Sequence, residues 1–492
     1  MTALPSPVPH QDTSSGEPAR YYLPATAAAL VALGLYVLTM APDLSWANGA
    51  IDGAELITAS ATLGIPHPPG YPTYVVLGKL FSLLPVGTVA FRYNLFSAVC
   101  AAGAVGLVVL TAGSLYPRVR SAAAMSAALL FGFAPLVWSQ AVVAEVYSLN
   151  LLLIAAFLLV WSWRGASISS GLLLGIAITT HLTSVLWLPA FFIAGNRQWR
   201  RAGAGLALGL SPLLLLTILA QGESPVVWGR PVDLVGWWWL VSGRLYAANL
   251  QPGYDAGRWL NLLRAVALGP VAFLAAGRTV LKATPTIAEA AAASTRPTPR
   301  LLAGTGLLYV AFALSYDTPD AAVLLLPVFL VLALLVTPLL QRLGAAAWLL
   351  PLVLATLPFG VRDLRSQPPV RALAGEVLQT APENALLLTP GDRTIFTLLY
   401  FQQVEGERPD LRLVDANLFA FDWYRARLRA QYPDVLVPAE DNLAALQREN
   451  GGQRPFCVVG LVSPPDAISS MAHASIEAGD GAPYLSCAEE VK

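Results

Sequence analysis

Long apolar runs with very few charges constrain this chain more than any other feature of its sequence. The first run, residues 22–40, has the length that a helix needs to cross a lipid bilayer. Hydrophobic residues make up 56% of the chain and charged residues 12%, whereas soluble domains average roughly 45–50% and 25%. Because a backbone in lipid must satisfy its own hydrogen bonds, these runs predict a polytopic α-helical membrane protein.

The runs predict roughly 10 to 12 membrane helices, counting one re-entrant pair. A shorter segment, residues 71–85, is flanked by proline and is expected to lie along the membrane interface. The other expected membrane segments are residues 95–116, 121–138, 147–163, 171–194, 202–220, 260–277, 301–315, 321–340 and 345–359.

Basic residues set the expected orientation of the bundle. Arg118 and Arg120 lie between the second and third long runs, which makes that loop cytoplasmic and places Asp52 on the outer side. The run at 171–194 has basic residues near both ends, so both ends are expected to be cytoplasmic. A re-entrant pair of short helices that turns near His181 would satisfy this expectation. A single spanning helix is the alternative.

Beyond residue 361 the composition becomes charged and polar, and strand-like segments alternate with helical patterns. This alternation predicts a small α/β domain with a parallel sheet. Strands are expected at 385–389, 411–415 and 456–460. The expected organisation is a disordered cytoplasmic tail at 1–21, a membrane domain at 22–361 with its first outer loop at 41–92, and an extracytoplasmic domain at 362–492.

Charge and cysteine content bound two further properties. The formal net charge is zero, so no global field would attract nucleic acid, and nucleic-acid binding is not expected. The chain has three cysteines, of which Cys457 and Cys487 share the last segment. These two would pair only in an oxidising compartment, so unpaired thiols are the default expectation.

The stretch IDGAELITASATLGIPHPPGYP, residues 51–72, brings Asp52, Glu55 and His67 close together in sequence directly after the first apolar run. Ionisable groups beside membrane helices are costly unless they have partners or a function. On a helix, Asp52 and Glu55 would share one face, either as a general base and its partner or as a helix cap with a third-position acid. Prolines around His67 stiffen the backbone and aim the ring, and Gly70 relieves the crowding between them, although a plain interfacial histidine is the alternative.

Further polar residues are expected near the same outer face. Glu145 and Tyr147 lie in WSQAVVAEVYSLN, where Glu145 would hydrogen-bond a sugar hydroxyl or pair with an arginine. Arg230 and Arg244 are candidates for phosphate contacts because guanidinium binds phosphate bidentately. Lipid headgroup binding is their alternative role. The full set of expected substrate-binding residues is His67, Tyr71, Arg92, Glu145, Tyr147, His181, Arg230, Arg244 and Asp317.

The sequence has no HExxH, P-loop or GxSxG motif. This argues against the common zinc, nucleotide and serine-hydrolase sites. No cofactor is therefore expected, and a divalent metal ion is left open.

Several long motifs resemble one known family. IDGAELITASATLGIPHPPGYPTYVVLGKLFSLLPVG with AFRYNLFSA resembles the first outer loop of the protein O-mannosyltransferase-like membrane proteins, within the GT-C glycosyltransferase superfamily. WSQAVVAEVYSLN, TTHLTSVLWLPA, VVWGRPVDL with SGRLY, and YDTPDAAVLLLP resemble later segments of that family in the same order. NALLLTPGDRTIFTLLYFQQVEGERPDLRLVD with DWYRARL resembles its C-terminal domain, so the resemblance covers residues 41–428.

The resemblance implies an enzyme that uses a polyprenyl-phosphate sugar, with Asp52 in the place of the catalytic carboxylate and Glu55 as the second acid. The corresponding hypothesis is an inverting glycosyltransferase that acts at the outer face of a bacterial inner membrane. It would move a sugar, with mannose suggested by eukaryotic relatives, to a hydroxyl of a protein or lipid acceptor. Its partners would be the donor lipid, the acceptor and membrane lipids. The competing hypotheses are a transporter or flippase for lipid-linked saccharides and a structural or assembly protein.

Overall fold

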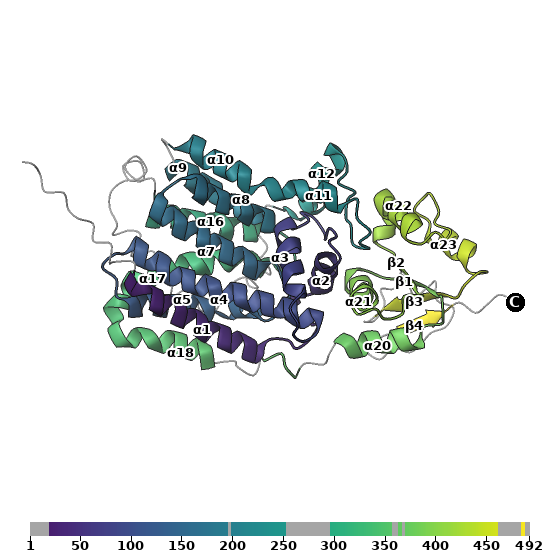
Figure 1. Ribbon diagram of the computed structural model, residues 1–492, viewed down its shortest axis with the longest axis horizontal. Helices are drawn as coiled ribbons and strands as arrows, with labels where there is room; N and C mark the ends of the chain where they lie inside the picture. The colour runs from purple at the N-terminus through teal and green to yellow at the C-terminus, as the bar shows by residue number, and fades with distance from the viewer. Residues whose placement is uncertain are drawn as a thin grey trace, which may run out of the picture.

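The computed structural model describes residues 19–194, 198–251, 296–356, 363–366, 370–460 and 484–487. The expected tail up to residue 18 and the expected span at 260–277 lie outside these residues. Figure 1 shows long helices side by side in one part of the molecule and a small sheet in the other, with α2 (Gly53–Ala61) and α3 (Pro72–Ser82) between them. The first outer loop therefore lies where the two parts meet.

Five helices in the described part of the chain are long and apolar enough to cross a membrane. A sixth span results if α5 (Ser121–Gly132) and α6 (Pro135–Ala141), which are bent by 69°, count as one. These helices identify a multi-pass membrane protein. The number is lower than the sequence predicts for three reasons. One expected span is outside the described residues, the runs at 168–194 and 299–315 form shorter helices, and the expected spans at 321–340 and 345–359 count as one, Ala321–Thr356.

The five spans are Ala19–Thr39 (α1), Val89–Leu115 (α4), Tyr147–Arg164 (α7), Trp199–Leu219 and Ala321–Thr356. The fourth contains α10 (Trp199–Gly209) and α11 (Leu215–Leu219), and the fifth contains η5 (Ala321–Leu325), α17 (Leu326–Leu343) and α18 (Leu349–Thr356). Further helices in this part are η1 (Ala47–Gly49), η3 (Ser211–Leu214), α12 (Leu234–Val241), η4 (Arg244–Asn249), α16 (Pro299–Ser315) and η6 (Gly344–Trp348).

The expected turn near His181 coincides with a break between helices. α8 (Ile168–Thr180) ends directly before His181, whose backbone is extended. The short helices η2 (Leu182–Trp187) and α9 (Leu188–Ala194) follow. Two short segments thus replace one straight helix, and the ring of His181 is held at a helix end.

Glycines bring α8 and α10 into close contact. A methyl group at Gly171 or Gly175 would collide with the backbone of α10, and one at Gly205 or Gly209 would collide with the backbone of α8. Both pairs have the four-residue spacing that lets membrane helices approach closely. This contact fixes the helix that ends at His181.

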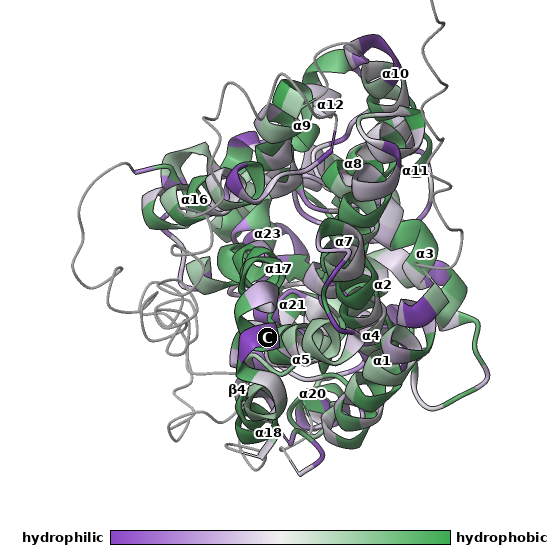
Figure 2. Ribbon diagram, turned by 90° about the vertical axis from the view of Figure 1, so that its left-hand side faces the viewer, coloured by the Kyte–Doolittle hydropathy of each residue, from purple (hydrophilic) through white to green (hydrophobic). Residues whose placement is uncertain are grey.

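The helices consist largely of hydrophobic residues, which are green in Figure 2. Leu30 on α1, Leu208 on α10 and Leu349 on α18 are among those exposed. A hydrophilic patch marks the start of α10, where Arg200 and Arg201 lie. Exposed apolar side chains on such helices are expected where the surface faces lipid.

A four-stranded sheet of order β2-β1-β3-β4 organises the C-terminal region. β1 pairs in parallel with β2 and β3, and β4 pairs antiparallel with β3. The three strands expected from the sequence are present, and β4 is an addition. The elements are α20 (Val370–Thr380), β1 (Leu386–Thr389), α21 (Asp392–Gln403), β2 (Arg412–Asp415), α22 (Asp422–Gln431), α23 (Leu443–Asn450), β3 (Phe456–Gly460) and β4 (Tyr484–Cys487).

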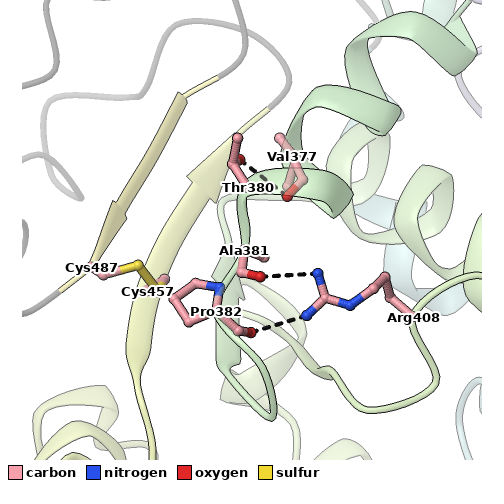
Figure 3. Close-up of a disulfide and its surroundings, with 7 residues drawn as sticks. All are labelled: Val377, Thr380, Ala381, Pro382, Arg408, Cys457 and Cys487. Carbon is pink, nitrogen blue, oxygen red and sulfur yellow. Dashed lines mark hydrogen bonds between the residues drawn. A yellow bond between two sulfur atoms is a disulfide. The ribbon is translucent and has the colours of Figure 1, made fainter.

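Cys457 on β3 and Cys487 on β4 form a disulfide (Figure 3), so the default expectation of unpaired thiols is wrong. They are direct partners across the strand pair, which the sequence does not reveal because β4 has no clear strand pattern. In the same view, Arg408 donates hydrogen bonds to the carbonyls of Ala381 and Pro382 at 2.9 and 3.0 Å. The disulfide between Cys457 and Cys487 indicates an oxidising compartment for this region.

The C-terminal region and the first outer loop share one cluster of buried side chains. Ile57 of α2 and Tyr74 of α3 belong to the same cluster as Leu387 of β1 and Phe401 of α21. α2 also packs directly on α21. The hydrophobic core of the sheet region is therefore continuous with buried side chains of the first outer loop.

Arg371 adds a polar connection between the same two regions. Its Nε lies 2.8 Å from Asp43 of the first outer loop, and its NH1 lies 3.2 Å from Glu407 beyond α21. The backbone N–H of Ala90, at the start of α4, donates to the hydroxyl of Tyr400 at 3.2 Å. These contacts dock the C-terminal region against the first outer loop.

Candidate active site

Asp52, Glu55 and His67 come together at the junction of the helices and the sheet region. Each offers a charged or ring atom, and these atoms lie within 4.8 Å of one another. α2 carries Glu55 in its first turn, with Asp52 immediately before it. The proline- and glycine-rich loop after α2 then returns His67 to that end of the helix. The structure thus unites the three residues that the sequence singles out.

Glu55 holds His67 through two contacts. Its Oε1 accepts from the backbone N–H of His67 at 2.8 Å, and its Oε2 lies 2.6 Å from Nδ1 of the ring. The side chain of Glu55 is only 2% exposed. The helix-cap alternative is wrong, because Asp52 makes no capping hydrogen bond and Glu55 binds His67 instead.

The neighbours of His67 determine its charge. Burial by itself lowers the pKa of an imidazole, but the charges of Glu55 and Asp52 and the hydrogen bond to Glu55 outweigh it and raise the pKa of His67 to about 10. His67 is therefore protonated at neutral pH. Its Nδ1–H donates to Glu55, and its Nε2–H donates to the hydroxyl of Tyr71 at 2.9 Å.

Asp52 is the open carboxylate of the cluster, with 43% of its side chain exposed. Its Oδ2 lies 3.9 Å from Nε2 of His67, which allows attraction between charges but not a hydrogen bond. Crowding by the surrounding protein, with the charges of Glu55 and Asp320, raises the pKa of Asp52, while His67 opposes the change. A carboxylate of raised pKa with an open side can accept a proton from a bound hydroxyl.

Tyr71 links this cluster to His181. Its backbone is in the left-handed region with φ 40°, a conformation that costs free energy for a non-glycine residue and is frequent at functional turns. Its hydroxyl contacts His67, and its ring stacks on His181 with 6.3 Å between ring centres. The ring of Tyr147 lies 5.4 Å from His181. His181 is therefore flanked by two tyrosines, one of which also binds His67.

A small pocket lies beside His181, and both polar and apolar side chains line it. His181 itself contacts Thr183, with 2.7 Å between Nδ1 and Oγ1. The lining residues are Tyr147, Asn150, Leu151, His181, Thr183, Val323, Leu324, Leu326 and Pro327.

Glu145 lies on the segment between α6 and α7 and is 5% exposed. Burial and the charge of Asp52 raise the pKa of Glu145, while His67 opposes the change. The carboxylate is thus within electrostatic reach of the cluster. Among the described residues no arginine pairs with Glu145, so the alternative role as an ion-pair partner finds no support there.

Arg230 and Arg244 are exposed and lie on the segments that border the site. Each is two residues away from an aromatic ring that faces His67. The ring of Trp228 lies 6.4 Å from that of His67, and the ring of Tyr246 lies 6.2 Å from it. Neither Trp228 nor Tyr246 was singled out by the sequence, although Trp228 belongs to the motif VVWGRPVDL and Tyr246 to SGRLY.

Arg92 has a structural set of partners. Its guanidinium donates to the carbonyls of Ser82, Val86 and Gly87 at 2.5, 2.8 and 3.1 Å. These bonds close the turn between α3 and α4. The expected substrate contact of Arg92 therefore gains no support from its position.

The two acids of YDTPD differ in their relation to the site. Asp317 is exposed, and its backbone N–H donates to the carbonyl of Asn249 at 2.8 Å. Asp320 is the residue whose charge acts on Asp52 and Glu145. The structure thus favours Asp320 over Asp317 as the acid that influences the cluster.

Asp392 joins the site from the C-terminal region and is absent from the candidates that the sequence suggests. It is the first residue of α21, just beyond the end of β1. Enclosure by the protein, with the charges of Glu55, Asp415 and Asp52, raises the pKa of Asp392 to about 7. The strand–Gly–Asp–helix pattern of TPGDRT could have identified it, because α/β sheets place ligand-binding residues at the carboxyl ends of their strands.

The cluster has the residue types that bind a divalent metal ion. Because Glu55 occupies Nδ1 of His67, the direct ligands would be Asp52 and Nε2 of His67. Glu55 would then orient the ring, as carboxylates behind metal-bound histidines commonly do. The sequence leaves a divalent metal ion open without predicting one, and a metal at Nε2 would have to displace the proton and the contact with Tyr71.

Two segments of the chain match families of known proteins. Residues 52–200 match the family model of the protein O-mannosyl-transferase TMEM260 N-terminal domain. Residues 370–441 match that of the TMEM260-associated domain 2. The first match contains Asp52, Glu55, His67 and His181, and the second contains Asp392. Both sides of the junction are therefore similar to this family.

Two curated relatives carry related names. The chain is 24% identical over 443 residues to protein O-mannosyl-transferase TMEM260 of Mus musculus, which covers 79% of this chain and 62% of the mouse protein. It is 30% identical over 237 residues to protein O-mannosyl-transferase tmem260 of Dictyostelium discoideum, which covers 41% of this chain and 28% of that protein. The chain thus matches less than two thirds of the length of either relative.

Solved structures of ArnT from Cupriavidus metallidurans share the fold. The apo form aligns over 94% of this chain and 97% of the ArnT chain, with a TM-score of 0.54 and 14% identity. The form bound to undecaprenyl phosphate aligns over 96% and 98%, with a TM-score of 0.52 and 15% identity. The likeness covers nearly the whole of both chains, including the C-terminal region.

Proposed function

We propose that this chain, a protein O-mannosyltransferase-like membrane protein with a GT-C fold, transfers a sugar from a polyprenyl-phosphate donor to a hydroxyl acceptor. The observation that carries the proposal is the junction cluster, in which an open carboxylate lies beside a protonated histidine that a buried glutamate holds in place. The relatives are named as O-mannosyl-transferases, which favours mannose as the sugar. One ArnT structure contains undecaprenyl phosphate, which favours a polyprenyl-phosphate donor.

Asp52 is the proposed general base. It takes the proton of the acceptor hydroxyl while that oxygen bonds to the anomeric carbon of the sugar. The bond from this carbon to the phosphate oxygen breaks, and polyprenyl phosphate leaves with the electron pair. One displacement of this kind inverts the anomeric centre. General-base assistance contributes about 10²–10⁴-fold, so orientation and charge stabilisation must supply the rest.

Glu55 is the proposed positioning residue. Both of its oxygens contact His67, and its side chain is almost fully buried, so it has no free side for a substrate. Its charge keeps His67 protonated, and the positive ring in turn attracts Asp52. This arrangement supports Asp52, rather than Glu55, as the group that meets the acceptor.

Polar side chains around His181 suit the phosphate of the donor lipid. The small pocket there combines tyrosine, asparagine and threonine with leucine, valine and proline. It has room for about one water molecule, so the lipid chain would lie outside it. Arg230 and Arg244 on the bordering segments would attract the phosphate, because guanidinium stays charged and binds phosphate bidentately. Glu145 and Tyr147 would contact the sugar between these groups.

The site would face the outer side of the membrane. The disulfide supports an oxidising compartment for the C-terminal region, and that region docks on the loop that carries Asp52. The positive-inside rule gives the same orientation from the sequence. For a bacterial protein this would be the outer face of the inner membrane.

Two isosteric substitutions test the assignment. Purified protein in detergent is incubated with labelled polyprenyl-phosphate mannose and a serine- or threonine-containing peptide. We expect transfer by the wild type, a loss of at least about 100-fold in Asp52→Asn, and a smaller loss in Glu55→Gln. Asp441→Asn, an exposed site in the C-terminal region, serves as the matched control and should retain the wild-type rate.

Two results would contradict the proposal. One is an absence of transfer by the wild type with every polyprenyl-phosphate sugar that is tried. The other is a wild-type rate in Asp52→Asn. A transporter or flippase would instead move the lipid-linked sugar across vesicle membranes without forming a new glycosidic bond.

A further inference from the structure

Asp392 is a carboxylate at the junction that the proposed chemical step does not use. The surrounding protein crowds it on one side, but the residue stays accessible to solvent, and within the described part of the chain its carboxylate has no hydrogen-bond or ion-pair partner. Its neighbour Asp415 is different. Asp415 is buried and accepts from the backbone N–H groups of Asn417 and Leu418 and from the hydroxyl of Thr389. Asp415 thus has a structural role, whereas Asp392 is available to a ligand.

Contacts between α21 and the first outer loop fix the position of Asp392. The indole N–H of Trp46 donates to Oγ1 of Thr397 at 3.3 Å, one turn along α21. The guanidinium of Arg393 lies 5.3 Å from the centre of the Trp46 ring. α21 also packs on α2, and the charges of Glu55 and Asp52 act on Asp392, so the first turn of α21 lies within electrostatic reach of both acids.

Aromatic side chains connect the same helix with His67. The ring of Trp228 lies 6.4 Å from His67 on one side and 6.4 Å from Phe396 of α21 on the other. Trp423, at the start of α22, lies 5.6 Å from Trp228. The ring of Trp228 therefore connects Phe396 of the C-terminal region with His67 of the cluster.

Acidic side chains outnumber the cations in direct contact with Asp52. Glu55, Asp320 and Asp392 all act on the cluster, and the charge of Asp392 reaches both Asp52 and His67. His67 is the one cation that contacts the acids of the cluster among the described residues. Arg230 and Arg244, on the bordering segments, are assigned to the donor phosphate, and the guanidinium of Arg393 lies over the ring of Trp46. At the open side of Asp52 the acids therefore favour a cationic group beside the acceptor hydroxyl over an anionic one.

We propose that Asp392 is a specificity-determining residue that selects acceptors whose reacting hydroxyl is flanked by neutral or positively charged groups. This inference rests on the proposed function and adds the chemical class of the acceptor to it. It assigns to the C-terminal region a direct part in acceptor binding. It also predicts that hydroxyls beside phosphate or carboxylate groups are poor acceptors.

Matched peptides test the proposal. The acceptors share one central threonine, flanked by lysine in the first peptide and by glutamate in the second. For each, kcat/KM is measured by transfer from the labelled donor, and Kd is measured without donor by anisotropy of a dye-labelled peptide. The protein variants are Asp392→Asn and Asp392→Lys, with Asp441→Asn and Asp441→Lys as controls at an exposed aspartate of the same region.

We expect the wild type to favour the lysine peptide in both measurements. The ratio should fall about three- to tenfold in Asp392→Asn, as expected for a charge a few ångströms from the ligand that is partly screened by salt. It should fall further or invert in Asp392→Lys. Both Asp441 variants should keep the wild-type ratio.

Three outcomes would overturn the inference. They are a wild-type preference for the glutamate peptide, a ratio that both Asp392 variants leave unchanged, and an equal change in the Asp441 variants. The Kd measurement without donor tests this inference independently of the proposed function. A Kd ratio that depends on Asp392 without any sugar transfer would support acceptor binding at this site and contradict the glycosyltransferase.

Discussion

Asp52 and Glu55 are three residues apart at the start of α2 and yet face different surroundings. The loop that returns His67 covers Glu55 and binds both of its oxygens, while Asp52 stays open on its other side. The spacing in the sequence predicts that the two acids share a face. It cannot say which one is open, because that depends on a loop and on α21, which is more than three hundred residues away.

The ion pair of His67 with Glu55 predicts a pH-dependent stability. The folded pKa of about 10 lies above the ordinary value of 6.5. The stabilisation is therefore complete below pH 6.5 and is lost as the pH rises towards 10. We expect His67→Gln to lower the free energy of unfolding by roughly 2–4 kcal/mol at pH 6.

Thermal unfolding of both proteins in detergent, across this pH range, measures the effect. The difference between wild type and His67→Gln should shrink as the pH approaches 10. Groups far from His67 titrate alike in both proteins, so their effect cancels in the difference between the two stabilities. A difference that is constant over the whole range would show that the charge of His67 does not stabilise the fold.

Among the elements, α8 depends on the glycines that let it approach α10. We expect Gly209→Ala to destabilise the protein by about 1–3 kcal/mol, because the new methyl group would collide with the backbone of α8. The shift of α8 should displace His181 and lower the transfer rate.

Gly203→Ala is the matched control for this substitution. It lies on the same helix, and an added methyl group there has open space around it. This variant should be neutral or slightly more stable, because alanine favours a helix over glycine. Thermal unfolding and transfer assays compare the two variants. Equal behaviour would mean that the close approach of α8 and α10 is not needed.

Elements with strong local signals are the ones that the sequence predicts. The long helices, the break at His181 and strands β1 to β3 follow from apolar length, charge and alternation. The disulfide, β4 and Asp392 depend on contacts between distant segments, which single-sequence patterns do not contain. The sequence also could not predict the role of Arg92. An arginine at a membrane edge can bind backbone carbonyls as readily as phosphate, and Arg92 binds carbonyls.

At the scale of the whole molecule, the buried cluster shared by the two regions predicts that they stay together without a covalent link. A protease site inserted after Ser366, an exposed residue between them, allows the chain to be cut once the protein is folded. We expect both fragments to coelute in gel filtration in detergent and to retain transfer activity.

A variant with weaker contacts between the C-terminal region and the first outer loop is the comparison for that experiment. In the cut protein, Arg371→Met removes the contacts to Asp43 and Glu407 and should promote separation of the fragments. The same substitution in the uncut chain should have a smaller effect, because the linker keeps the local concentration high. Immediate separation of the cut wild-type fragments would show that the shared cluster does not hold the regions together.

The shared cluster can form only after both of its halves have been synthesised. The apolar side of α2 is made early, but its cover on α21 is about 340 residues later, a delay of roughly 20–70 seconds at a synthesis rate of about 5–20 residues per second. During that interval the nascent loop exposes Ile57 and its neighbours at the membrane surface. A chaperone on that side, or temporary burial in lipid headgroups, would have to protect it until the ribosome has finished the last domain.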